Sequence, residues 1–168
     1  MSSSLLVAYA TQYGSTREVA DAMASVLRER GVLVDVKPAR DVRELEQYDA
    51  VVLGAPLFMF HWHKEALRFL ARHQKDLLER QVALFALGPV HHPYDEKEWL
   101  DSQAQLNKEL ASYPWLKPVE IKVLGGKYDP TKLAFPIKLL AGKAPASDVR
   151  DWAEIRSWAA SLTTRLEL

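Results

Sequence analysis

The sequence predicts an α/β fold built on a doubly wound sheet of five parallel strands. Short apolar or β-branched runs alternate with longer segments of helical periodicity, which is the pattern of a parallel sheet covered on both faces. No repeat, low-complexity tract or Gly/Pro/Ser-rich linker interrupts this alternation. Because 168 residues with 48% hydrophobic residues can form one core of ordinary size, we expect a single domain over 1–168.

Five short apolar runs are predicted as strands. They are residues 4–10, 33–37, 49–54, 82–87 and 119–124. The first crossover, residues 15–30, is predicted as an amphipathic helix that stops at Gly31. Its apolar side chains recur at three-to-four spacing, at Val19, Met23, Val26 and Leu27.

Three further long helices and one short helix are expected between and after the later strands. The long ones cover residues 62–79, 95–112 and 148–166, and the short one covers residues 40–48. The leucines of the 62–79 segment form an apolar stripe similar to that of the first helix.

Composition excludes several classes of function. Lys plus Arg and Asp plus Glu number 22 each, so no global positive field favours nucleic acid. The absence of cysteine excludes disulfide scaffolds, thiol catalysis and thiolate metal sites. The first residues resemble no signal peptide, and no apolar run approaches the roughly 18 residues of a membrane span. We therefore expect a cytoplasmic protein.

The stretch "YATQYGST", residues 9–16, leads from the first strand directly into the first helix. Helix N-termini leave amides unpaired and carry a partial positive charge, so such a loop can bind a phosphate. Hydroxyls at Thr11, Ser15 and Thr16 add donors, and Gly14 allows positive φ. The stretch contains neither an ATPase P-loop nor a dinucleotide-binding glycine fingerprint.

The alternative for the same stretch is a purely structural helix cap. Ser15 or Thr16 would cap the helix, and Glu18 would complete a capping box from Ser15.

Aromatic and imidazole side chains follow the third and fourth strands. Residues 57–62, "LFMFHW", and residues 88–99, "GPVHHPYDEKEW", fall at the carboxyl ends of their strands, where doubly wound sheets bind ligands. This composition favours a planar aromatic ligand. The alternative is that Phe58, Phe60 and Trp62 anchor their loop in the core.

Together, "YATQYGST", "GAPLFMFHWHKEALRFL" and "LGPVHHPYD" resemble the flavodoxin family, and within it the flavodoxin-like, menaquinone-dependent protoporphyrinogen oxidase type and related bacterial proteins. The resemblance covers nearly the whole chain and implies a three-layer α/β/α fold with FMN as cofactor. It implies that the FMN phosphate is held by Thr11, Gln12, Tyr13, Gly14, Ser15 and Thr16. It implies that one side of the isoalloxazine is lined by Ala55, Pro56, Leu57, Phe58 and Met59. The other side would be lined by Leu87, Gly88, Pro89, Val90, His91 and His92.

Three features depart from an electron-shuttle flavodoxin. Tyr13 stands where many flavodoxins have threonine, the chain is neutral rather than acidic, and residues 57–59 contain no glycine. A positive φ in that last segment would be strained, so we expect mainly two-electron chemistry.

The resemblance leaves the function open between an FMN-dependent oxidoreductase and a non-enzymatic electron carrier that serves a reductase. A flavin-free interaction module is a third reading. The expected partners are a redox protein or a quinone or porphyrin-like small molecule, and no nucleic acid.

Two further features complete the expectations. His61, His63, His91 and His92 lack firm carboxylate or thiolate partners for a metal, so we expect no metal site and assign them to packing or proton delivery. Residues 127–143 mix four lysines with apolar residues, which favours contact with an anionic membrane surface, a place for an apolar substrate to lie, or an ordinary surface helix.

Overall fold

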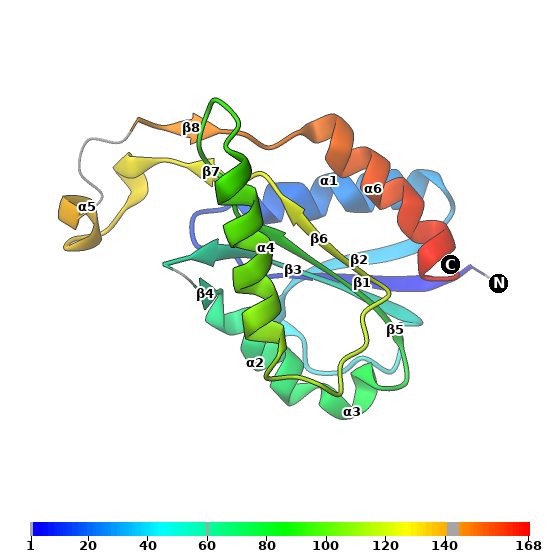
Figure 1. Cartoon of the computed structure of the whole chain (residues 1–168). Coiled ribbons are helices and arrows are strands. Elements are labelled where there is room, and N and C mark those ends of the chain that lie inside the picture. Colours follow the sequence, from blue (N-terminus) through cyan, green and yellow to red (C-terminus); the bar gives the residue numbers. More distant parts are fainter. Residues whose placement is uncertain (1, 60, 141–144) are drawn as a thin grey trace.

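The computed structural model describes residues 2–59, 61–140 and 145–168. Five parallel strands lie in the order β2-β1-β3-β5-β6, with helices on both faces of the sheet (Figure 1). These strands are β1 Ser4–Tyr9, β2 Leu33–Pro38, β3 Ala50–Phe58, β5 Gln81–Leu87 and β6 Glu120–Leu124. The predicted fold class is confirmed, and each predicted strand is present.

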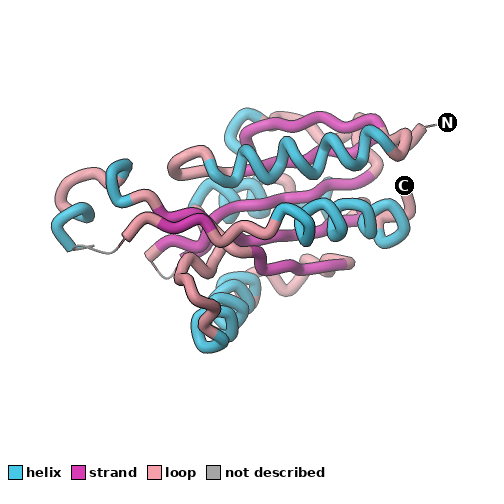
Figure 2. Tube along the Cα trace, turned by 90° about the horizontal axis from the view of Figure 1, so that it is seen from above, coloured by secondary structure: helices cyan, strands magenta, loops and turns pink. Residues whose placement is uncertain are grey.

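The helices form two layers. One face of the sheet is covered by α1 Ser15–Glu29 and α6 Trp152–Arg165, and the other by α2 Lys64–Arg72, α3 Gln74–Leu77 and α4 Glu96–Leu110 (Figures 1 and 2). Alternate side chains of β1 serve the two layers, since Leu5 and Val7 belong to one core and Leu6 and Ala8 to the other. The sheet therefore has no solvent-facing side at its centre.

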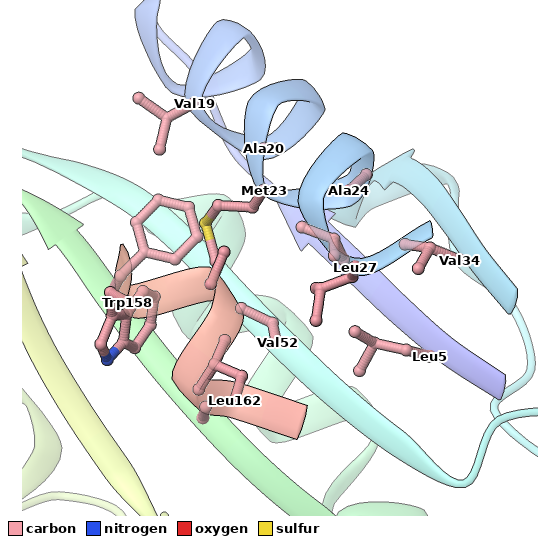
Figure 3. Packing of buried hydrophobic residues seen from close by; sticks show 14 of the residues in the cluster. Leu5, Val19, Ala20, Met23, Ala24, Leu27, Val34, Val52, Trp158 and Leu162 are labelled. Atoms are coloured by element: carbon pink, nitrogen blue, oxygen red, sulfur yellow. The ribbon is translucent and has the colours of Figure 1, made fainter. Parts of the chain in front are cut away.

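The core between the sheet, α1 and α6 shows why the predicted apolar stripe forms a helix. Met23 and Leu27 of α1 point toward the sheet and pack in one cluster with Val52 of β3 and with Trp158 and Leu162 of α6 (Figure 3). Burial of this stripe, rather than intrinsic propensity, supplies most of the stability of such a helix.

An arm extends from the end of the sheet where the parallel strands finish, opposite both chain termini (Figures 1 and 2). We use this name for residues 127–140 together with 145–148. At its base β7 Lys127–Tyr128 pairs antiparallel with β8 Ser147–Asp148. Beyond β7 the arm contains a 3-10 turn, η2 Pro130–Lys132, and one short helix, α5 Ile137–Leu140.

The predicted helix over 62–79 is wrong at its start and in its middle. His61–Trp62 form β4, which pairs antiparallel with β3, because Trp62 is buried and its Nε1 donates to the carbonyl of Ala55 at 2.9 Å. The chain then forms two helices separated at His73, whose buried ring packs against Phe69.

Two other predicted helices also need correction. Within 40–48, only η1 Ala39–Asp41 is helical, because Val42, Leu45 and Tyr48 are buried individually beside the sheet. The last helix begins at Trp152 rather than at 148. Asp151 caps it by accepting from the amide of Glu154 at 3.1 Å.

A glycine inside β3 allows a large ring to lie across the strand. A Cβ at Gly54 would lie 1.9 Å from Cζ of Phe85. Phe85 is fully buried and meets Trp158 edge to face, with ring centroids 6.0 Å apart. The ring of Phe85 therefore occupies the space that a side chain at position 54 would need.

We predict that Gly54→Ala destabilises the fold by about 2–3 kcal/mol, measured by urea unfolding, because it overpacks this contact. Phe85→Leu should recover part of that loss in the double variant, since it removes the clashing ring atoms. Purely additive costs of the two substitutions would contradict this explanation.

Candidate functional site

The turn between β1 and α1 leaves the first amides of the helix without a side-chain cap. Gly14 occupies the N-cap position with φ 97°, and its amide donates to Thr11 Oγ1 at 2.8 Å. The predicted cap by Ser15 or Thr16, with its capping box, is wrong, because no side chain caps α1. The amides of the first turn therefore face the carboxyl end of β1 as donors for an anion.

Thr16, in the same turn, carries a buried hydroxyl without a partner. Its side chain is fully buried, and Oγ1 makes no hydrogen bond to any described residue. An unsatisfied buried polar group costs roughly 1–3 kcal/mol, and a bound ligand atom is one way in which such a group is satisfied. This orphaned hydroxyl fits a ligand oxygen at the first turn of α1.

A cleft of about 160 Å³ opens beside this turn, at the carboxyl ends of three strands. Predicted residues from the three loops meet in it. They are Gln12, Tyr13, Ser15, Pro56, Leu57, Phe58, Met59, Leu87, Gly88 and Val90. The crevice lies where β1 has β2 on one side and β3 on the other, which is the switch point of a doubly wound sheet.

Tyr13 and Phe58, which both line the cleft, pack against each other. The rings of Tyr13 and Phe58 meet edge to face with centroids 6.4 Å apart. Tyr13 thus supplies ring packing that a threonine could not. The contact also ties the first loop to the end of β3.

Met59 lies at the edge of the cleft in an unusual backbone conformation. Its φ is 50°, in the left-handed region that non-glycine residues rarely adopt, and 55% of the residue is exposed. The strain expected for a positive φ in the segment 57–59 is therefore already present at this position.

Some predicted residues do not line this cleft. Ala55 is fully buried in the core, and the carbonyl of Pro89 accepts from the amide of Gly126 at 2.7 Å. Thr11 and Gly14 line a neighbouring cavity on the β2 side of the loop.

His91 and His92 line a second cavity of about 520 Å³. This second cavity is bounded by Val90, His91, His92, Tyr128 and residues 145–148, and it shares Val90 and Tyr128 with the cleft. The two spaces are therefore adjacent, with the base of the arm between them.

One wall of the cleft consists mostly of residues from the 127–143 segment, which the sequence analysis singled out but did not assign to the flavin site. It comes from the end of β6 and the base of the arm, and consists of Gly126, Lys127, Tyr128, Asp129 and Leu133. The strand-end rule applied to the fifth predicted strand would have found the first of these residues.

The histidines have separate protein partners. His61 Nδ1 lies 2.7 Å from a carboxylate oxygen of Glu109, and His91 pairs with Glu98. His63 Nδ1 caps α2 by accepting from the amide of Glu65 at 3.1 Å, and burial lowers the pKa of this imidazole, which favours the neutral form that capping needs. Within the described residues, no group of three or more His, Asp or Glu side chains could hold a metal ion.

Comparisons with known proteins agree with this geometry. The family model described as a flavodoxin domain matches residues 6–141. The chain belongs to the flavodoxin domain family. Membership of this family implies a flavin cofactor.

Relatives of this flavodoxin-domain protein include enzymes and flavodoxins. It is 27% identical to protoporphyrinogen IX dehydrogenase [quinone] of Escherichia coli strain K12, over 92% of this chain and 91% of that protein. Its fold matches oxidised flavodoxin 1 from Bacillus cereus with a TM-score of 0.60 at 21% identity, over 96% and 98% of the two chains. A short-chain flavodoxin associated with a bacterial microcompartment matches with a TM-score of 0.63 at 15% identity, over 98% and 97%.

None of the helices in the described part of this flavodoxin-domain protein combines the length and apolar character that crossing a membrane requires.

Proposed function

We propose that this protein binds FMN, with the phosphate at the first turn of α1 and the flavin ring in the cleft. The observation that carries the proposal is the orphaned, buried hydroxyl of Thr16 beside an uncapped helix N-terminus. The amides of that turn and the hydroxyls of Thr11 and Thr16 would bind the phosphate oxygens. The apolar ends of β3 and β5 would exclude water from the ring.

We propose further that the protein is an oxidoreductase of the protoporphyrinogen oxidase type. Bound FMN supplies hydride and electron transfer. The second cavity adjoins the cleft, so an apolar, flat substrate such as a porphyrinogen or quinone could lie there within reach of the flavin ring. The 27% identity to the Escherichia coli dehydrogenase over almost the whole chain supports this assignment.

The His91–Glu98 pair would handle the proton of that reaction. Glu98 accepts from the amides of Val90 and His91 at 2.7 and 3.1 Å, and it also holds Nδ1 of His91. This leaves Nε2 of His91, whose ring lines the second cavity, to exchange a proton with a substrate.

A non-enzymatic electron carrier is the second candidate. The exposure of Met59 at the edge of the cleft favours it, because a redox partner protein could approach the flavin there. Such a carrier would turn over no small substrate by itself.

We also propose that the arm contacts an anionic membrane surface from the cytoplasmic side. Phe135 and Leu139 are 79% and 71% exposed. Residues 127–140 carry three lysines and one aspartate, a net charge of 3 − 1 = +2. Apolar side chains beside lysines suit the boundary between head groups and acyl chains, from which a lipid-soluble quinone would enter. Lys143 belongs to the predicted segment 127–143 but lies outside the described residues.

Thr16→Val tests cofactor binding. Thr16→Val should leave the apoprotein at least as stable, because it removes an unsatisfied hydroxyl, while FMN affinity falls about tenfold. Flavin fluorescence titration and urea unfolding measure the two effects. Ser25→Ala, an exposed hydroxyl on the same helix, is the matched control. Unchanged FMN affinity in Thr16→Val, or no FMN binding by the unaltered protein, would contradict the proposed site.

Turnover of protoporphyrinogen tests the enzymatic assignment. The FMN-loaded protein should oxidise protoporphyrinogen with a quinone as acceptor under anaerobic conditions. His91→Ala should lower kcat about 10²-fold, because it removes the proton-exchanging imidazole. His61→Ala is the matched control, since it removes a histidine paired with a glutamate outside both cavities. An FMN-loaded protein without turnover that accumulates one-electron reduced flavin would identify the carrier instead.

Vesicle binding tests the proposed membrane contact of the arm. Phe135→Ser with Leu139→Ser, and separately Lys132→Glu with Lys138→Glu, should each reduce sedimentation with anionic phosphatidylglycerol vesicles about tenfold. Neutral phosphatidylcholine vesicles should bind the unaltered protein weakly. The control is Leu33→Ser with Leu78→Ser, which removes two comparably exposed leucines outside the arm. Equal losses in this control would rule out a specific contact through the arm.

A further inference from the structure

Arg150 is a buried cation that sequence analysis did not single out. In the described part of the chain, the buried polar residues are Thr16, His73, Ser102 and Arg150, and only 3% of the Arg150 side chain is exposed. Its Nε and Nη2 donate to the two carboxylate oxygens of Asp148 at 2.9 and 2.8 Å. The guanidinium also lies over the ring of Trp152, 4.8 Å from its centroid.

The third nitrogen of this guanidinium reaches the first turn of α1. Nη1 donates to the carbonyl of Ser15 at 3.2 Å and lies 3.4 Å from a carboxylate oxygen of Glu18. Arg150 lies two residues after the arm, whereas Ser15 is the first residue of α1. The contact thus joins a residue near the end of the chain to the turn whose amides face the proposed phosphate.

Glu18 is the only acidic residue in the first turn of α1. A carboxylate there interacts well with the helix dipole, but it would repel a phosphate dianion bound at the same turn. Arg150 is the cation that lies against it. Hydrogen bonds from Arg150 hold the pKa of Asp148 below its usual value, so the Arg150–Asp148 pair stays charged at neutral pH.

We propose that Arg150 is a positioning residue that makes the site selective for a phosphorylated flavin over an unphosphorylated one. Its charge is shared between Asp148 and Glu18, so it offsets part of the charge of Glu18, and it holds the Ser15 carbonyl, so that the first turn presents its amides to a dianion. This inference rests on the proposed binding of FMN and adds to it the source of phosphate selectivity.

A merely structural clamp would behave differently. If Arg150 only fastened the arm to the body, its loss would disturb the ring pocket and weaken FMN and riboflavin equally. If it acts on the phosphate end, only FMN, which carries the phosphate, should lose affinity.

The test compares FMN and riboflavin affinities by flavin fluorescence at low ionic strength. Arg150→Gln should weaken FMN binding about tenfold and change riboflavin binding less than twofold. Adding Glu18→Gln to this variant should recover FMN affinity several-fold, because of the two carboxylates that lose Arg150 the one in the first turn of α1 is then neutral. Arg165→Gln, which breaks the pair between Arg165 and Glu120, is the matched control and should change neither affinity.

Glu18→Gln alone keeps the proposal testable if Arg150→Gln fails to fold. With Arg150 in place, the carboxylate of Glu18 is partly offset and its exposed side chain is screened by water, so this variant should change FMN affinity less than twofold. A gain above fivefold would overturn the proposal, as would equal losses of FMN and riboflavin binding in Arg150→Gln. Failure of the unaltered protein to bind FMN would instead refute the proposed function on which the inference rests.

Discussion

The position of β1 between β2 and β3 is the constraint on which the site depends. Strands β1 and β3 pair in parallel, but the chain leaving β1 enters α1 on one face of the sheet and the chain leaving β3 leads to α2 on the other face. A crevice must open where they diverge, and the chain that leaves β1 enters α1 at that point. The uncapped amides of α1, the orphaned Thr16 hydroxyl and the apolar cleft are therefore together because of the strand order.

The electrostatics of this crevice differ from those of a strongly charged site. Donors at the first turn are uncharged amides and hydroxyls, which bind an anion without a permanent positive patch. The charges nearest to them are those of Arg17 and Glu18 in the first turn and of Arg150 and Asp148 beside it, two positive and two negative. The neutral composition of the whole chain is consistent with this balance and leaves the basic arm as a local feature.

The elements that sequence reasoning assigned incorrectly share one physical cause. The spacing of Val42, Leu45 and Tyr48 matches a helix, yet each side chain finds its own place beside the sheet. Trp62 continues an apolar pattern into α2, but its indole bonds to the carbonyl of Ala55 and draws the chain into a strand. In both cases tertiary packing overrides a local pattern, because burial stabilises more than helix propensity does.

Local patterns in the sequence were enough to predict the strands, the main crossover helices and the three strand-end loops that meet in the cleft. Alternating hydrophobicity and glycine position are local properties, whereas the order β2-β1-β3-β5-β6 is a property of the assembled sheet. Two features appear only in the folded chain: the base of the arm forms a wall of the cleft, and Arg150 lies against Ser15. The separation of these last two residues along the chain is 135, and no local pattern encodes a contact over that distance. Such contacts arise only when the packed sheet brings the start of α1 and the segment after the arm to the same edge.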